Sequence, residues 1–156
     1  MFPISSILWP SDGSESSFRA LEAAVEIAQR FNASLYALQV VQQVPPLVVG
    51  SGFAPMAIKG FDVPLYQQEL LKSAEDDLSQ AVSDKVPKEV EVFSEVRIGE
   101  PANIILEFGL EKKIGLIVMA TQGRTGFSRF MIGSVAEKTI RQSTIPTLII
   151  PAAGDA

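Results

Sequence analysis

The chain has 156 residues, of which 47% are hydrophobic, so it can form one domain with a hydrophobic core but not two average domains. Its formal net charge of −5 disfavours nucleic-acid binding as the main function. The absence of histidine and cysteine excludes Ser-His-Asp catalysis, cysteine nucleophiles and metal sites built from these side chains. Any bound metal must therefore be held by oxygen atoms, and we expect a single domain spanning residues 1–156.

The N-terminal third of the chain bears on cellular location. Its first ten residues lack the basic segment, long apolar run and small-residue cleavage site of a secretory signal, so we expect a cytoplasmic protein. Residues 31–58 carry no charge and are long enough to span a bilayer. Because this stretch contains several glutamines and the pair Pro45-Pro46, we interpret it as a strand running into a loop, and we expect no membrane association.

Helical and strand-like segments alternate along the chain, which is the pattern of an α/β protein with a mainly parallel sheet. Each expected strand is a short apolar or β-branched run bounded by glycine, proline or polar residues. In chain order, the expected elements are a strand at about Ile4–Trp9, a helix at Ser14–Phe31, a strand at Ser34–Val41, a helix at Val63–Lys85, a strand at Val90–Arg97, a helix from Pro101 to about Lys112, a strand at Gly115–Ala120, a helix from Ser128 or Gly133 to Gln142, and a strand at Thr147–Ile150.

The first expected helix has the clearest amphipathic pattern in the chain. Its apolar residues recur at steps of three and four, from Phe18 through Leu21 and Val25 to Ala28, which places them on one face. The apolar residues that precede Trp9 mark the first strand as buried. We therefore expect Trp9 to pack in the core against this helix rather than to stack on a ligand.

Residues Gln43–Phe61 form an expected loop of unusual length, in which prolines and glycines alternate with apolar residues. Loops of this length are usually functional or disordered. The apolar content indicates packing against a partner subunit, a bound ligand or the loop's own domain. The sequence leaves these three interpretations open.

Two strand-to-helix junctions have an unusual composition. In an open parallel sheet, ligands bind outside the carboxyl ends of the strands, which is where both junctions lie. The first junction is Pro10–Ser14, and the second runs from Ala120 through Gly123 to Gly133-Ser134. Glycines that allow close backbone approach, followed by bare amides at a helix start, suit phosphate oxygens. Turn formation and helix capping would require the same residues and remain the alternative.

The charge around the second junction is locally positive, because Arg124, Arg129, Lys138 and Arg141 face only Glu137. Such a stretch suits an anion site, although a solvated helix face would look the same for the two C-terminal cations. The standard nucleotide signatures are absent: no glycine-rich segment ends in Lys-Ser or Lys-Thr, and Gly50-Ser51-Gly52 lacks the third glycine of a dinucleotide motif. A P-loop ATPase and a dinucleotide-binding domain are therefore poor fits.

Several segments together resemble the universal stress protein family. They are the opening run Ile7–Ser14, the turn Gly99-Glu100-Pro101, and the long stretch Leu116–Pro151. The most specific feature is the family's nucleotide motif: a glycine, two residues, a glycine, nine residues, then glycine with serine or threonine. It falls here on Ala120, Gly123, Gly133 and Ser134. Alanine replaces the first glycine, which is tolerated if the backbone at that position has a negative φ.

Resemblance to the ATP-binding branch of the family implies roles for individual residues. The backbone of Val40 would pair with adenine, and Asp12 would accept hydrogen bonds from the ribose hydroxyls. Without the resemblance, Asp12 could be a turn residue and Val40 an ordinary strand valine. ATP or AMP is the implied cofactor, with Mg²⁺ held only through the phosphates; no catalytic residue is expected. The implied nucleotide-binding residues are Pro10, Ser11, Asp12, Val40, Met119, Ala120, Gly123, Arg124, Gly133, Ser134 and Val135.

The family also implies an open five-stranded parallel sheet in the order 3-2-1-4-5, with helices on both faces, which is a Rossmann-like fold that binds adenine nucleotides. In that order the last strand, Thr147–Ile150, lies at an edge of the sheet. An apolar edge strand favours pairing with a second copy, so we expect a homodimer through it.

The implied function is a nucleotide-dependent stress-response switch that acts on an unidentified downstream protein. One alternative is an ATP hydrolase, which would be slow because only Glu137 and Gln122 lie near the motif and neither is convincingly placed to activate water. The other is a nucleotide-free dimeric interaction module, which the alanine at position 120 keeps open.

Overall fold

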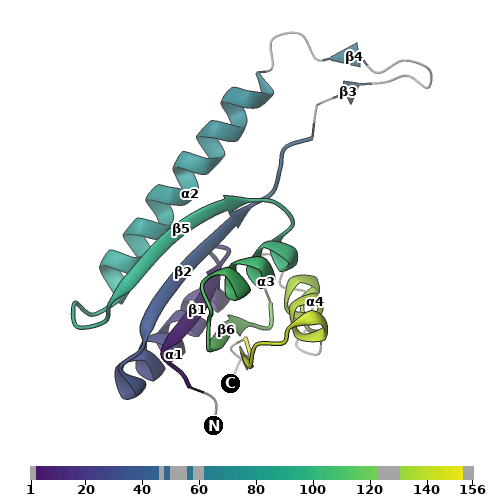
Figure 1. The fold of residues 1–156 in the computed structure, drawn as a ribbon. Coiled ribbons are helices and arrows are strands. Elements are labelled where there is room, and N and C mark those ends of the chain that lie inside the picture. Colours follow the sequence, from purple (N-terminus) through teal and green to yellow (C-terminus); the bar gives the residue numbers. More distant parts are fainter. Residues whose placement is uncertain (1–2, 46–47, 50–55, 58–61, 123–130, 153–156) are drawn as a thin grey trace.

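The structure is a computed structural model that describes residues 3–45, 48–49, 56–57, 62–122 and 131–152. Its five main strands are β1 (Ser6–Ser11), β2 (Ser34–Val41), β5 (Val92–Ile98), β6 (Leu116–Ala120) and β7 (Thr147–Ile150). They form one parallel sheet in the spatial order β5-β2-β1-β6-β7 (Figure 1). With these strands counted in sequence, that order is 3-2-1-4-5, which confirms the expected α/β fold.

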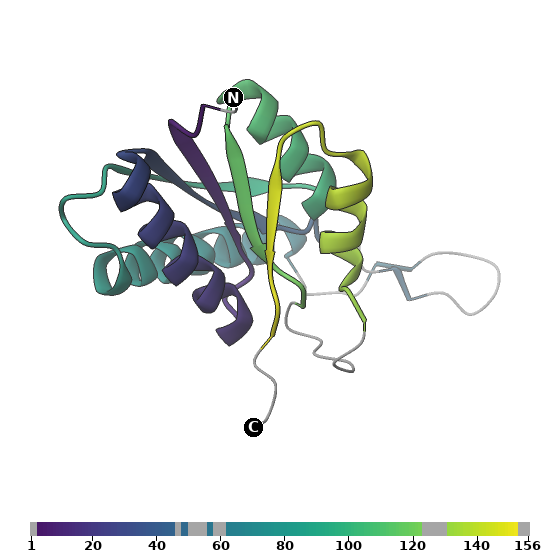
Figure 2. The ribbon, with the colours of Figure 1, turned by 90° about the horizontal axis from the view of Figure 1, so that it is seen from below.

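Four helices cover the two faces of this sheet. They are α1 (Glu15–Phe31), α2 (Val63–Lys85), α3 (Pro101–Glu111) and α4 (Ser134–Gln142). Helices α1 and α2 lie on one face, and α3 and α4 lie on the other (Figure 2). Within the described residues, none of these helices is both long and apolar enough to cross a membrane.

Side chains cap the N-termini of α1 and α2. The Ser14 side chain accepts a hydrogen bond from the Ser17 amide at 3.2 Å, and the Asp62 carboxylate accepts one from the Leu65 amide at 3.0 Å. Each interaction satisfies an amide that lacks a partner inside the helix. Of the two starting points expected for the last helix, the structure shows the later one, with Gly133 as the N-cap.

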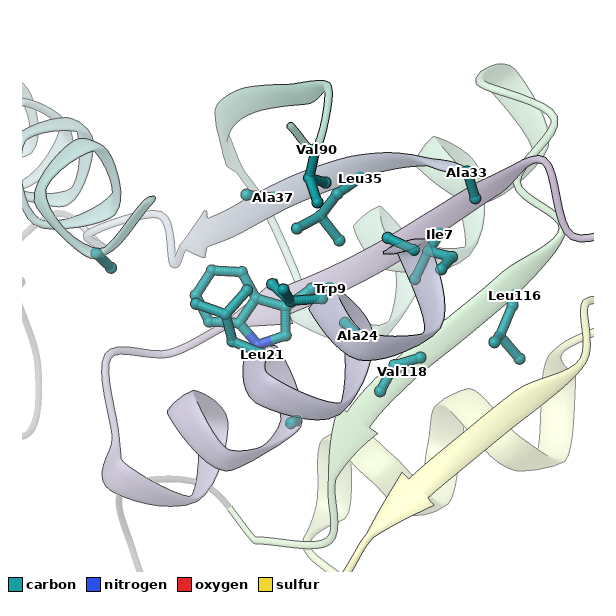
Figure 3. Packing of buried hydrophobic residues seen from close by; sticks show 14 of the residues in the cluster. Ile7, Trp9, Leu21, Ala24, Ala33, Leu35, Ala37, Val90, Leu116 and Val118 are labelled. Carbon is teal, nitrogen blue, oxygen red and sulfur yellow. The ribbon is translucent and has the colours of Figure 1, made fainter. Parts of the chain in front are cut away.

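The core consists of two hydrophobic layers separated by the sheet. Successive side chains of a strand point to opposite faces, so Ile7 and Trp9 pack under α1 while Leu8 packs under α3. Trp9 lies beside Leu21 and Ala24 of α1 (Figure 3) and has no exposed surface. Its Nε1 donates a hydrogen bond to the Ser17 carbonyl at 2.8 Å. The prediction that Trp9 is a core residue is confirmed.

Strand β1 differs from its expected bounds, because it starts later and continues through Pro10 to Ser11. It pairs with β2 along its whole length but with β6 only at Ile7 and Leu8. Proline has no backbone N–H, so it is tolerated where a strand has stopped donating to a neighbour. The sheet thus separates between β1 and β6 at its carboxyl end. Strand β5 likewise begins and ends slightly later than expected, at Val92 and Ile98.

The segment expected as a plain loop, Gln43–Phe61, contains a short antiparallel pair. Strand β3 (Val48–Val49) pairs with β4 (Met56–Ala57), which the sequence reading missed because two-residue strands leave no periodic pattern. The pair lies beyond the end of β2, near the start of α2 (Figure 1). Before it, the Gln67 carboxamide oxygen of α2 accepts a hydrogen bond from the Val44 amide at 2.7 Å, which joins the chain leaving β2 to α2.

Candidate functional site

A cavity of about 570 Å³ lies at the carboxyl ends of the strands. It occupies the point where the chain turns from β1 to α1 on one face and from β6 toward α4 on the other. Because β1 and β6 separate beyond Leu8, the backbone leaves a crevice there that side chains do not fill. Open parallel sheets bind ligands at such a reversal of strand order.

The cavity gathers most of the residues that the sequence singled out, from segments far apart in the chain. Residues 123 and 124 lie outside the described residues, so the structure gives no position for Gly123 and Arg124. The other predicted site residues all line the cavity: Pro10, Ser11, Asp12, Val40, Met119, Ala120, Gly133, Ser134 and Val135.

The first junction is a hydrogen-bonded turn between β1 and α1. The Asp12 carboxylate accepts a hydrogen bond from the Ser14 amide at 2.9 Å, and Ser11 Oγ accepts one from the Gly13 amide at 3.1 Å. Gly13 has a φ of 78°, which a side chain would strain. Asp12 therefore holds the turn, as the structural alternative required, and it also lines the cavity.

The second junction brings the described residues on either side of 123–130 together. The Gly133 amide donates to the Thr121 carbonyl at 2.6 Å, and the Gln122 carboxamide donates to the Met131 carbonyl at 3.2 Å. These contacts hold the start of α4 against the end of β6. The first turn of α4, with Ser134 and Val135, consequently faces the cavity.

Helix α4 differs from the other helices in its N-terminal cap. The residue at this position is Gly133, and no side-chain capping hydrogen bond is found for α4 within the described part of the chain. By contrast, the side chains of Ser14, Asp62 and Glu100 cap α1, α2 and α3. The first amides of α4 therefore keep their donors and the positive end of the helix dipole toward the cavity, an arrangement that favours an anion.

Ala120 occupies the place of the first motif glycine without backbone strain. It is the last residue of strand β6, and positive φ among the described non-glycine residues occurs only at Asn32 and Lys113. The condition under which alanine is tolerated at position 120 is therefore met. Its methyl group lies at the cavity wall.

Glu100 closes the N-terminus of α3 next to the cavity. Its carboxylate accepts hydrogen bonds from the Asn103 amide at 2.9 Å and the Ala102 amide at 3.3 Å, and it pairs with the Lys138 ammonium of α4 at 3.0 Å. Burial raises the pKa of the Glu100 carboxyl, but the hydrogen bonds from Asn103, Lys138 and Ala102 together hold it below its ordinary value. The charge of Lys138 is thus engaged at the surface rather than directed into the cavity.

We expect Glu100→Ala to lower the free energy of unfolding by about 1 kcal/mol at neutral pH, because two helix amides lose their cap. The folded pKa of Glu100 lies below the unfolded value, so its contribution is complete above the unfolded pKa and is lost as the pH falls through the folded one. Urea unfolding of the wild type and the variant at neutral and strongly acidic pH measures this loss. A difference that stays constant with pH would contradict the assignment; Glu107→Ala, on the exposed face of α3, is the control.

The sequence reading missed one wall of the cavity, which is formed by α2. Four residues of α2 line the cavity at the three- and four-residue spacing that places them on one face of the helix: Leu70, Ser73, Ala74 and Asp77. That periodicity is visible in the sequence, but it does not tell which end of the sheet the helix crosses. Gln39, the residue before Val40, was also missed.

The described lining of the cavity is acidic rather than basic. Its ionisable residues are Asp12 and Asp77, and no lysine or arginine belongs to the described lining. At the C-terminal end of the positive stretch, Arg141 pairs with Glu137 at 3.0 Å on the exposed face of α4. The solvated-face interpretation therefore holds for Lys138 and Arg141. No cluster of three or more acidic side chains that could hold a metal occurs among the described residues.

A sequence profile of the Universal stress protein family matches residues 3–151. The chain belongs to this family. Universal stress protein MJ0531 of Methanocaldococcus jannaschii is 36% identical over 149 residues, covering 92% of this chain and 80% of that protein. Universal stress protein YxiE of Bacillus subtilis is 32% identical over 140 residues, covering 89% of this chain and 93% of that protein.

Solved structures of the family share the fold. Universal stress protein UspA from Lactobacillus plantarum aligns with a TM-score of 0.74 at 24% identity, covering 94% of this chain and 97% of that one. A universal stress protein in complex with cAMP aligns with a TM-score of 0.61 at 22% identity, covering 97% and 99% of the two chains. The universal stress protein from Archaeoglobus fulgidus in complex with dAMP has a TM-score of 0.53 at 21% identity, covering 96% and 98%.

Proposed function

We propose that this universal stress protein binds an adenine nucleotide, with ATP as the first candidate and AMP as the second, in the cavity at the carboxyl ends of the strands. The observation that carries the proposal is the meeting of the Asp12 turn, the end of β2 and the start of α4 in one cavity. No side chain of the described residues caps the first amides of α4. Two proteins of the same fold are in complex with adenine nucleotides, cAMP in one and dAMP in the other.

Each part of the cavity has a proposed task. The backbone of Val40 pairs with the adenine base, and the Asp12 carboxylate accepts hydrogen bonds from the ribose hydroxyls beside Pro10 and Ser11. The amides at Ser134 and Val135 bind the phosphates, because they carry the positive end of the α4 dipole. In the proposal, Gly123 and Arg124 complete the phosphate site and Met119 and Ala120 form its floor. Mg²⁺ binds through the phosphates alone.

In the proposed function, nucleotide occupancy sets the conformation of a cytoplasmic stress-response switch, a single domain of residues 1–156, toward a downstream protein. The cavity supports this role because it is bounded by α1 and α2 from one face and by α3 and α4 from the other. A ligand that contacts helices on both faces can shift the equilibrium between two conformations of the protein if it binds one conformation more tightly than the other.

We also propose that the protein is a homodimer joined through β7. This strand is at the edge of the sheet and pairs, within the described residues, with β6 alone; Leu148 is 39% exposed. We expect sedimentation equilibrium at micromolar concentration to give the dimer mass, and Leu148→Lys to give the monomer, because a charged edge strand resists pairing. A monomeric wild type would contradict the proposal.

Calorimetric titration of ATP, AMP and cAMP, with and without Mg²⁺, tests the nucleotide proposal. A denatured sample is first examined for nucleotide carried through purification, since an occupied site would hide binding. Micromolar affinity for one of these nucleotides is the expected result. A cavity that is free of nucleotide and binds none of them would overturn the proposal and favour the nucleotide-free interaction module; phosphate release from bound ATP would instead favour the slow hydrolase.

A further inference from the structure

Gln39 is a buried polar residue at the carboxyl end of β2. Only 7% of its surface is exposed, and it is part of the cavity lining. In the sheet it lies between Ser11 of β1 and Val96 of β5. Strand alternation places its side chain on the face of Leu35 and Ala37, which α1 and α2 cover, at the side of the cavity that α2 closes.

The carboxamide of Gln39 lacks a hydrogen-bond partner in the described protein, where no side-chain hydrogen bond involves it. The other buried polar residues at this end of β1 do have partners, since Ser17 Oγ donates to Ser11 Oγ at 3.2 Å. The amide atoms of Gln39 are open to the cavity rather than enclosed by protein, because among the described residues Thr139 Oγ1 is the one fully buried side-chain polar atom that lacks a partner. Polar atoms at a cavity wall complete their hydrogen bonds with solvent or with a bound molecule. A bound molecule in the cavity would supply the missing donor and acceptor.

A carboxamide has a particular recognition chemistry, because it offers an N–H donor and a C=O acceptor side by side. Adenine presents the complementary pair on one edge, the N7 acceptor and the N6 amino donor. Guanine presents two acceptors there, N7 and O6, so a carboxamide can satisfy only one of them at a time. A glutamine amide that faces the cavity and makes no hydrogen bond to the described protein can therefore distinguish adenine from guanine, which an apolar side chain cannot do.

We propose that Gln39 is a specificity-determining residue that binds the N6/N7 edge of the adenine base through its side-chain amide. The inference rests on the proposed nucleotide site, because Val40, the adjacent residue of β2, is the proposed backbone contact of the same base. Consecutive residues of one strand would then contact the base from two directions, one through the main chain and the other through the side chain.

The test compares Gln39→Leu and Gln39→Met with the wild type in calorimetric titrations of AMP and GMP. We expect each variant to bind AMP about tenfold more weakly, because one or two hydrogen bonds to the base are lost. Each variant should also lose most of its preference for AMP over GMP. Thermal unfolding without nucleotide should be unchanged or shifted upward, because no protein hydrogen bond is removed and an apolar side chain is buried instead. Gln29→Leu, at an exposed position near the end of α1 far from the cavity, is the matched control.

The possible results separate the inference from the function on which it rests. Wild-type affinity and wild-type AMP preference in both variants, with the wild type binding AMP, would overturn the role of Gln39 alone. A wild type that binds no adenine nucleotide would overturn the proposed function and this inference with it. If circular dichroism shows that both variants are unfolded, the Gln39 amide is needed for folding, and the proposed role in base recognition is overturned.

Discussion

Replacing Trp9 with alanine is expected to lower the free energy of unfolding by about 3–5 kcal/mol, the range for deleting a large buried aromatic side chain. Trp9 has no exposed surface and packs between α1 and the sheet (Figure 3). The substitution leaves a cavity in this layer and removes the hydrogen bond that Trp9 Nε1 donates to the Ser17 carbonyl of α1. Because whole domains are stable by about 5–15 kcal/mol, this single change removes a large part of the total.

Urea unfolding followed by circular dichroism measures this effect, since the variant lacks the chain's one tryptophan as a fluorescent probe. Trp9→Phe separates the two contributions, because it keeps a ring but removes the side-chain hydrogen bond to the Ser17 carbonyl, at a cost of about 0.5–1.5 kcal/mol. Leu110→Ala, at a side chain that is 63% exposed, is the control and should change little. A Trp9→Ala variant as stable as this control would contradict the packing that the structure shows.

The second large effect is expected at the N-terminus of α4. Gly133→Asp should abolish tight nucleotide binding, with affinity falling about a hundredfold or more, because a carboxylate would face the phosphates at close range. The backbone of Gly133, with φ −60° and ψ 154°, accepts a side chain without strain. The aspartate would also cap the amides of α4 that the phosphates are proposed to use. Binding is thus expected to fall while the helix is left intact or slightly stabilised.

Two matched variants distinguish the reasons for this loss. Gly133→Asn can cap the same amides without a charge, so its affinity should lie between those of the wild type and Gly133→Asp. Gly133→Ala neither caps nor charges the helix and should bind nearly as the wild type does. Calorimetric titration of ATP with all three variants, after thermal unfolding shows that they are folded, measures the series. Equal affinity in Gly133→Asp and Gly133→Ala would refute phosphate binding at this helix end.

The strands and helices were largely predictable because each carries a local signal. Helix α2 matches its expected bounds, Val63–Lys85, since Asp62 caps it and Pro64 occupies its first turn. Strands β2 and β7 also match, because apolar runs bounded by polar residues mark both ends. The predicted end of strand β1 was wrong, because a proline usually ends a strand. Pro10 is tolerated here because β6 has already stopped pairing with β1 at that point, which only the sheet shows.

The candidate site was predictable only where glycines and turn residues follow a strand. Asp12, Gly133 and Ser134 stand at strand-to-helix junctions, so their composition marks them in the sequence. The α2 wall carries no such mark, because residues such as Ser73 and Asp77 look like an ordinary solvated helix face. Gln39 also reads as one polar residue in a strand, and its burial depends on α2 crossing this end of the sheet.

By itself, the sequence determined the class of fold, the absence of histidine and cysteine chemistry, and the two junctions at which a ligand could bind. These properties follow from local composition, periodicity and turn chemistry, which neighbouring residues along the chain decide. Only the tertiary structure decided that the two junctions share one cavity and that Gln39 lines it; within the described ranges, it also shows that no side chain caps α4 and none hydrogen-bonds the Gln39 amide. Those properties arise from strand order and helix packing, which bring together residues separated by about a hundred positions.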